Sequence, residues 1–245
     1  MLRKSVMILC AVLLPLSTAC ASPIIFSVTQ GNLAASAEFA ASGSNLVVTL
    51  TNTSPYDVLI PSQVLTAVFF NLGGNPTLTP VSAVLGAGSV VLFGGTDPGG
   101  VVGGEWDYRG DLTGAPLGAL YGIGSAGFGL FGSGGLFPGT NLQGPVSVNG
   151  GQYGITSAGD DPTTGNAKVT GDEALIQNSV VFTLSGLPGG FNPETGVSNV
   201  YFQYGTSLTD PGIQWIPEPG AASLVLIGLA LLGVRACHQR LRRRA

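Results

Sequence analysis

Residues 45–52 read Asn-Leu-Val-Val-Thr-Leu-Thr-Asn and are followed at once by Thr53, Ser54 and Pro55. Residues 178–185 read Asn-Ser-Val-Val-Phe-Thr-Leu-Ser and end before Gly186. β-Branched and aromatic residues bounded by turn-forming residues are typical of β-strands. We therefore predict that both segments are strands and that they set the fold class.

Further strand-like runs flank these two segments. They are separated by clusters of Gly, Pro, Asn and Asp, and they cover residues 23–29, 33–40, 64–71, 81–85, 89–93 and 198–204. Helical patterns are nearly absent, and no internal repeat suggests a propeller or a solenoid. The sequence predicts an all-β fold, an antiparallel β-sandwich or a jelly-roll-like domain. Residues 117–135 are so rich in glycine that we expect a long, partly packed loop there.

The composition supports a globular protein with an acidic central region. The chain has 39 glycines, yet 44% of its residues are hydrophobic and only 9% are charged, which argues against both collagen-like and charge-rich disordered polymers. Seven of the nine basic residues lie near the two ends, so only Arg109 and Lys168 remain between them. Twelve acidic residues oppose these two, which gives the central region a formal charge of about −10. We expect no binding to nucleic acid.

Cysteine and histidine are confined to the two terminal segments. The three cysteines are Cys10, Cys20 and Cys237, and the single histidine is His238. The central region therefore has no disulfide, no Cys-His or Ser-His-Asp site and no soft-metal site. It must be held together by core burial and strand pairing.

Residues 1–21 have the layout of a secretory signal peptide. A basic start precedes an apolar run over residues 6–16, and small residues stand at Ala19 and Ala21. Signal peptidase accepts small residues at these two positions, so we predict cleavage after Ala21. The N-terminal segment would form the signal helix that directs export.

Two alternatives exist for this segment, namely a buried N-terminal helix and lipoprotein processing at Cys20. Lipoprotein processing requires a large aliphatic residue three positions before the cysteine, where this chain has Ser17. We therefore favour the signal peptide.

Residues 215–245 combine three features in a fixed order. They are the motif Pro217, Glu218 and Pro219, an apolar run over residues 221–234, and a basic tail over residues 235–245 with Arg235, Arg240, Arg242, Arg243 and Arg244. A helix over the apolar run would be about 21 Å long, which is short for a hydrocarbon core of about 30 Å, so it would be a marginal transmembrane helix. The arginines should stay cytoplasmic, which places the preceding domain across the membrane.

The prolines of the motif should keep the backbone extended just outside the bilayer, where a protease could bind it. In this order of motif, span and basic tail, the chain resembles the PEP-CTERM sorting proteins of Gram-negative bacteria. The resemblance covers about the last thirty residues. It implies that exosortase, a membrane-embedded transpeptidase-like enzyme, recognises the tail and releases or transfers the protein to the cell surface or its polysaccharide matrix. The alternative is an ordinary C-terminal anchor that follows Pro-Glu-Pro by coincidence.

A second resemblance concerns the central region. The strand-like phrases over residues 46–52, 58–70, 182–186 and 200–205 are similar to ectodomains of exosortase-dependent surface proteins. This similarity implies a surface or matrix role and carries no activity.

One acidic segment beside aromatic residues raises the possibility of sugar binding or glycoside hydrolysis. Glu105, Asp107 and Asp111 flank Trp106, Tyr108 and Arg109. The alternative is an ordinary strand whose solvent-exposed face carries residues 105 and 107 and whose buried face carries residues 106 and 108. We favour this structural interpretation, and we expect no catalysis.

Two acidic pairs are candidates for calcium ligands, namely Asp160 with Asp161 and Asp172 with Glu173. No Asp-x-Asp-x-Asp-Gly loop is present, and acidic turn residues are commonly solvated or bonded to their own backbone. The glycine-rich runs near Gly94, Gly99 and Gly103 lack the lysine and the following helix of a phosphate-binding loop, so we interpret them as turns. We expect no cofactor and no resident metal.

The predicted organisation has three parts: a signal peptide at 1–21, an acidic glycine-rich all-β ectodomain at 22–214, and a sorting and anchor segment at 215–245. The predicted function is that of an exported, non-catalytic surface or biofilm-matrix protein, with a carbohydrate-binding module or weak glycan-active enzyme as the alternative. Its expected partners are signal peptidase, exosortase, the inner membrane during transit and exopolysaccharide. The ectodomain would pass through the periplasm to the cell surface or beyond.

Overall fold

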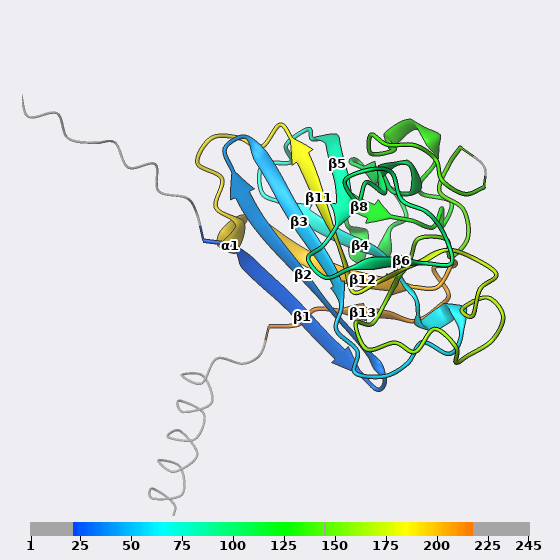
Figure 1. The fold of residues 1–245 in the computed structure, drawn as a ribbon. Helices are drawn as coiled ribbons and strands as arrows, with labels where there is room; N and C mark the ends of the chain where they lie inside the picture. Colours follow the sequence, from blue (N-terminus) through cyan, green and yellow to red (C-terminus); the bar gives the residue numbers. More distant parts are fainter. Residues whose placement is uncertain (1–21, 145, 218–245) are drawn as a thin grey trace, which may run out of the picture.

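The computed structural model describes residues 22–144 and 146–217, which form two β-sheets packed on one hydrophobic core (Figure 1). The predicted signal peptide, with Ala19 and Ala21, lies outside the described residues. So do Glu218, Pro219, the predicted span 221–234 and the basic tail. Within the described part of the chain, no helix is long and apolar enough to cross a membrane.

The first sheet has five strands, all antiparallel to their neighbours. In spatial order they are β1 (Ile24–Gln30), β2 (Leu33–Ser42), β3 (Asn45–Asn52), β11 (Ser179–Ser185) and β5 (Thr79–Leu85). The two segments that predicted the fold, β3 and β11, are direct neighbours, with Val48 opposite Phe182. They alternate as expected, since Leu46, Val48 and Leu50 are fully buried.

The second sheet is longer and more irregular. Its main path is β13 (Gly212–Gln214), β12 (Val197–Tyr204), β4 (Leu65–Leu72), β9 (Ile155–Thr156), β10 (Leu175–Gln177) and β6 (Val90–Leu92). Strand β8 (Tyr121–Gly124) also pairs with β4, and β7 (Asp107–Arg109) pairs with β8. The pair β9–β10 is parallel, whereas the other pairs of this sheet are antiparallel. The all-β, mainly antiparallel prediction is thus confirmed.

Aromatic side chains join the two sheets through the core. The rings of Phe39 and Phe70, one from each sheet, have centroids 5.0 Å apart. Those of Trp106 and Phe182 are 4.9 Å apart. Such contacts add stabilisation beyond the apolar area that they bury. The inward faces of both sheets therefore form one continuous core.

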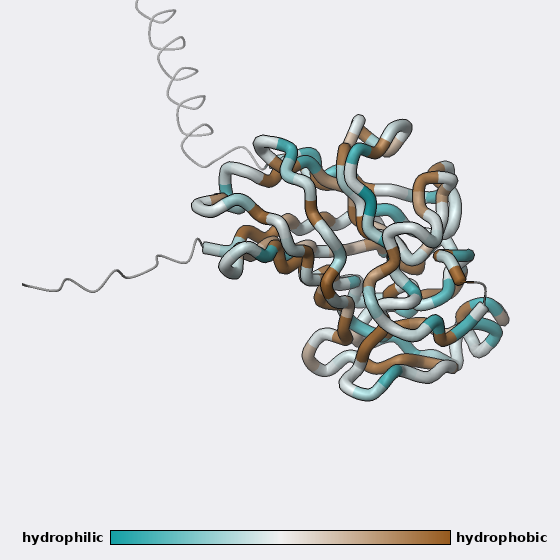
Figure 2. Tube along the Cα trace, turned by 90° about the horizontal axis from the view of Figure 1, so that it is seen from above, coloured by the Kyte–Doolittle hydropathy of each residue, from teal (hydrophilic) through white to brown (hydrophobic). Residues whose placement is uncertain are grey.

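Strand β4 is buried on both faces because loops form a third layer over the second sheet. Its Val68 and Phe70 face the main core, while Ala67 and Phe69 belong to a second apolar cluster. That cluster is completed by side chains from the connecting segments: Leu112, Ala115, Ala119, Phe128, Leu130 and Phe131. Brown, hydrophobic stretches accordingly recur in the loop-rich half of the molecule in Figure 2.

The prediction of one long loop over residues 117–135 was wrong in part, because β8 lies within it. Gly122 and Gly124 allow the strand to form there. A Cβ at Gly122 would lie only 2.8 Å from the ring of Phe69 and 2.9 Å from that of Phe131. Glycine is needed because these rings lie directly against the backbone.

The strand expected around residues 105–108 is present in part as β7, but the sequence failed to predict the short strands β9, β10 and β13. Each has two or three residues, too few for a recognisable alternation. One short helix, α1 (Pro193–Gly196), is the only α-helix in residues 22–144 and 146–217. Single-turn 3₁₀ segments occur at Pro61–Gln63, Gly103–Glu105, Pro116–Gly118 and Ser133–Gly135.

Candidate functional site

The acidic and aromatic segment around β7 lies inside the molecule. Trp106 is fully buried in the main core, where it packs on Phe182. Tyr108 is also buried, and its ring stacks with Tyr121 at a centroid distance of 6.5 Å. Trp106 therefore presents no face to a sugar, because both faces of the second sheet are covered around it.

Glu105 and Asp107 are buried as well, which contradicts the predicted solvent-exposed face. Their exposed fractions are 6% and 0%. The reason is non-local: the glycine-rich chain that follows β8 folds back over this side of β7. Sequence alternation shows that two faces differ, but it cannot show that a distant loop covers the second one.

Each buried carboxylate holds a different part of that covering chain. Glu105 accepts hydrogen bonds from the backbone N–H groups of Leu142 and Gln143, the second at 2.9 Å. Asp107 accepts one from Gly132 N at 3.2 Å, and its Oδ1 lies 3.5 Å from Nε of Arg109. Buried acceptors without partners cost stability, and these bonds offset that cost for Glu105 and for Oδ2 of Asp107. Oδ1 of Asp107 has no hydrogen-bond partner and lies beside the positive charge of Arg109.

Burial is the main influence on the acidity of both groups. It raises the pKa of Asp107 to about 6, although the bonds from Gly132 and Gly135 and the charge of Arg109 act in the opposite direction. It also raises the pKa of Glu105, against the two backbone bonds from the 142–143 segment. Desolvation disfavours the charged carboxylate in each case. The arrangement is that of two buried structural anchors, which are not exposed to a glycan in solution.

The third acid of this segment, Asp111, is exposed and does not anchor the covering loop as Glu105 and Asp107 do. It lies in a left-handed turn, with φ of 54°. Together with Tyr108 and Tyr121 it lines a small depression of about 150 Å³. Its charge contributes to the raised pKa of both tyrosines, whose larger cause is burial.

The first calcium candidate pair is divided between two environments. Asp160 is buried, and its Oδ1 accepts a hydrogen bond from Val58 N at 2.7 Å. Asp161 is exposed, and its Oδ1 is bonded to the N–H and the hydroxyl of Thr163 at 2.9 and 2.7 Å. Asp57 joins them by accepting from Asp161 N at 3.1 Å. These carboxylates thus hold the ends of two loops together.

Burial raises the pKa of Asp160, with a smaller contribution from the charges of Asp57 and Asp161. Local hydrogen bonds from Thr163 lower the pKa of Asp161. Among the described residues, no group of three His, Cys, Asp or Glu side chains is placed to hold a metal.

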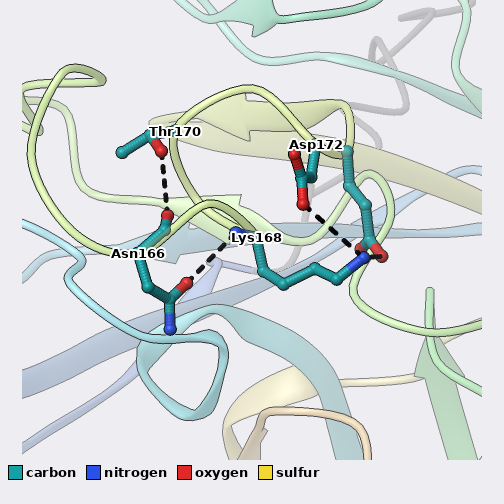
Figure 3. Close-up of polar contacts among 5 residues, drawn as sticks. Asn166, Lys168, Thr170 and Asp172 are labelled. Atoms are coloured by element: carbon teal, nitrogen blue, oxygen red, sulfur yellow. Dashed lines mark hydrogen bonds and ion pairs between the residues drawn. The ribbon is translucent and has the colours of Figure 1, made fainter.

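The second calcium candidate pair faces a cation of the chain itself (Figure 3). Nζ of Lys168 lies 3.9 Å from Asp172 and 3.4 Å from Glu173. Asn166 shapes the same loop by accepting from Lys168 N at 3.1 Å and from the Thr170 hydroxyl at 3.0 Å. Because Lys168 offsets one of the two negative charges and contacts both carboxylates, it competes with Ca²⁺ for this loop.

The remaining place of interest is where the folded domain meets the predicted targeting segments. The ring of Trp215 packs edge-on against Phe26 of β1, with centroids 4.8 Å apart. Trp215 N donates to Val200 O at 2.9 Å, so the packed structure continues to this residue. The next two residues, Ile216 and Pro217, are exposed. The first residue of the Pro-Glu-Pro motif therefore stands just beyond the last packed side chain.

A groove of about 320 Å³ lies at this junction, lined by residues of β1, β12, β13 and α1 together with Trp215 and Pro217. The sequence did not predict that residues at the start and the end of the ectodomain would meet there. The signal was the pair Phe26 and Trp215, two large aromatics at the two limits of an otherwise strand-rich region. No family model, curated protein or solved structure matches this chain.

Proposed function

We propose that this chain is an exported surface protein whose ectodomain is delivered by the N-terminal signal peptide and sorted by the C-terminal Pro-Glu-Pro segment. In this proposal signal peptidase cuts after Ala21, and an exosortase processes the chain at Pro217, Glu218 and Pro219. The span 221–234 holds the protein in the inner membrane during transit, with Arg235 and the four later arginines on the cytoplasmic side.

One observation supports this proposal most directly, namely that both limits of the folded domain lie together. Strand β1 begins at Ile24, three residues after Ala21, and the last packed residue is Trp215, two before Pro217. The contact between Phe26 and Trp215 brings these limits side by side. Two membrane segments attached there could occupy one bilayer while the domain stays on one side of it.

The connections between the folded domain and the two proposed membrane segments are short. Ala21 is three residues from Ile24, and residue 221 is six residues from Trp215. Fully extended chain spans at most about 3.6 Å per residue, so these connections reach about 10 and 20 Å. During transit the end of the domain where β1 begins would be held close to the membrane surface. The Pro-Glu-Pro motif would then lie between the domain and the membrane.

The proposed role at the surface is structural or adhesive rather than catalytic. The carboxylates that could have formed a glycan site, Glu105 and Asp107, hold the covering loop. Those that could have bound calcium are bonded to backbone groups or to Lys168. We propose that the acidic ectodomain takes part in the extracellular polysaccharide matrix through its outer surface.

The test compares two glutamates that both follow a proline. Glu218→Gln changes the centre of the motif, whereas Glu194→Gln changes an exposed glutamate that follows the buried Pro193 at the start of α1. In the producing bacterium, we expect the Glu218 variant to accumulate in the inner membrane and the Glu194 variant to reach the surface like the parent chain. Equal surface delivery of both variants would contradict processing at the motif.

A further inference from the structure

Among residues 22–144 and 146–217, no strand pairs with the outer edge of β1 in the first sheet, whereas the opposite edge of that sheet is covered. The opposite edge, β5, is covered by the segment before the β7 region: Leu85 N donates to Gly100 O at 2.9 Å, and Val102 N donates to Ala83 O at 3.0 Å. Strand β5 also contains Pro80. Prolines and covering loops are common means of blocking a strand edge.

The ends of the second sheet are also short or covered. Strands β13 and β6 have three residues each. Strand β7 is bridged to Leu136, and Phe137 N donates to Trp106 O at 2.9 Å. Short or covered edges offer few free backbone groups to another chain.

Strand β1 has none of these protections. It runs for seven residues, Ile-Ile-Phe-Ser-Val-Thr-Gln, with no proline, no charge and no break in its pairing with β2. Within the described residues, its backbone makes hydrogen bonds to β2 alone. The outward side chains are exposed, with Ile25 at 58%. Every second N–H and C=O group along its outer side is therefore free for another strand.

In the described part of the chain, the C-terminal segment makes no backbone hydrogen bond to this edge, although the ring of Trp215 packs on Phe26. Trp215 is bonded to Val200 of β12, so the chain leaves along the second sheet. Figure 1 shows β1 as the outermost strand of its layer.

We propose that β1 pairs antiparallel with β1 of a second copy of this chain, which joins two five-stranded sheets into one continuous sheet. This inference goes beyond the sorting proposal and does not depend on it. A free strand edge is satisfied by another strand. The second copy is the occupant because the sequence of β1 is self-complementary about Ser27 and because β1 itself carries no charged residue that would repel its copy.

Pairing about Ser27 places buried side chains opposite buried ones and exposed side chains opposite exposed ones. Ser27 would face Ser27 of the second copy, Phe26 would face Val28, and Ile25 would face Thr29. The pairs Phe26–Val28 lie on the side of the core and the pairs Ile25–Thr29 on the exposed side, in keeping with the burial of β1 in the single chain. Aromatic and β-branched cross-strand pairs of this kind stabilise sheets.

Electrostatics permits pairing at this edge, because β1 has no charged side chain. With a formal charge of about −10, two copies repel each other, so contact requires a strip without acidic groups. The nearest acid of the first sheet is Glu38, which lies on β2 opposite Ile25. In the pair, the two Glu38 residues would be at least three strand spacings apart, about 14 Å, which exceeds the Debye length of about 8 Å at physiological salt.

The first test measures association of the full-length chain in detergent by sedimentation. We expect a dimer for the parent chain, loss of the dimer for Ser27→Lys, and retention of the dimer for Thr183→Lys, which places the same charge on the central strand β11. Thermal unfolding would verify that both variants are folded. A monomeric parent chain, or a dimeric Ser27→Lys variant, would overturn the proposal.

The second test determines the register by cysteine cross-linking in a chain whose Cys10, Cys20 and Cys237 are replaced by serine. Ser27→Cys would place two thiols directly opposite, at a Cα separation of about 4.5 to 5.5 Å that a disulfide can bridge. Ser36→Cys is the matched control, because Ser36 faces Ser27 on β2 and would be about 14 Å from its copy. We expect a cross-linked homodimer from the first variant alone. Equal cross-linking of both, or a cross-link to a different protein, would contradict self-pairing through β1.

Discussion

At the scale of single residues, two buried carboxylates act as anchors for a glycine-rich covering loop. Asp107 and Glu105 are held by backbone N–H groups from residues 132 and 142–143. Charge-assisted hydrogen bonds of this kind offset part of the cost of burying a carboxylate. They do not remove it, since the pKa of both groups remains raised.

The raised pKa of Asp107 makes stability depend on pH. Because its folded pKa of about 6 exceeds its unfolded value of 3.8, the folded state binds more protons between these two values. The contribution of Asp107 to the free energy of unfolding therefore falls as pH rises from about 4 to 6 and levels off above that range. Over this interval, we expect the free energy of unfolding of the Asp107→Asn variant to fall by about 1 to 3 kcal/mol less than that of the parent chain.

Urea unfolding at pH 4.5 and pH 7.5 measures this difference. Asp161→Asn is the control, because Asp161 is exposed and its pKa is lowered, so it should not reduce the loss of stability toward pH 7.5. Parallel pH profiles for the parent chain and the Asp107 variant would contradict the proposed anchor.

Trp106 shows how burial decides between a core residue and a ligand contact. Its ring packs on Phe182, so Trp106→Ala should lower the free energy of unfolding by about 3 to 5 kcal/mol. Ile216→Ala, at a site 70% exposed, should have almost no effect. Denaturant unfolding measures both changes. A Trp106→Ala variant of unchanged stability would mean that the indole is not part of the core.

At the scale of elements, the covering loop depends on close backbone approach to β7. A Cβ at Gly135 would collide with the carbonyl oxygen of Tyr108 and with the carboxylate of Asp107. By contrast, a Cβ at Gly159 would meet nothing within 4 Å. The loop is therefore held at a distance that only glycine allows at position 135.

We expect Gly135→Ala to destabilise the domain by about 1 to 3 kcal/mol, the usual cost of inserting a methyl group into packed structure. Gly159→Ala should be neutral. In the Gly135→Ala variant, the weaker packing of the loop would appear as faster hydrogen exchange of the amides at Gly132, Leu142 and Gln143. Protection of these amides at the parent level would contradict the dependence of the loop on this contact.

The strands that could be predicted are those long enough to show alternation. Both segments that set the fold class, β3 and β11, and the edge strand β1 belong to this group. Strand β8 could not be predicted, because its glycines are required by rings that reach them from other elements. The buried state of residues 105 and 107 was missed for the same reason, since the chain that covers them is distant in sequence. Local pattern predicts elements, whereas covering layers arise from tertiary contacts.

In the whole molecule, the domain begins and ends at neighbouring places. Phe26 and Trp215 join the two limits of the fold, and the open edge β1 lies at the same end. A domain built in this way can be held by two terminal segments at one membrane and still present its loop-rich half outward (Figure 1). Release at the motif would free β1 from the neighbourhood of the bilayer and leave it open to a second copy.

The most direct test of export and sorting is the intact mass of the chain recovered from the surface of the producing bacterium. The account predicts a polypeptide that begins at Ser22 and lacks residues 221–245. A surface form that retains residues 221–245, or that still carries residues 1–21, would contradict it.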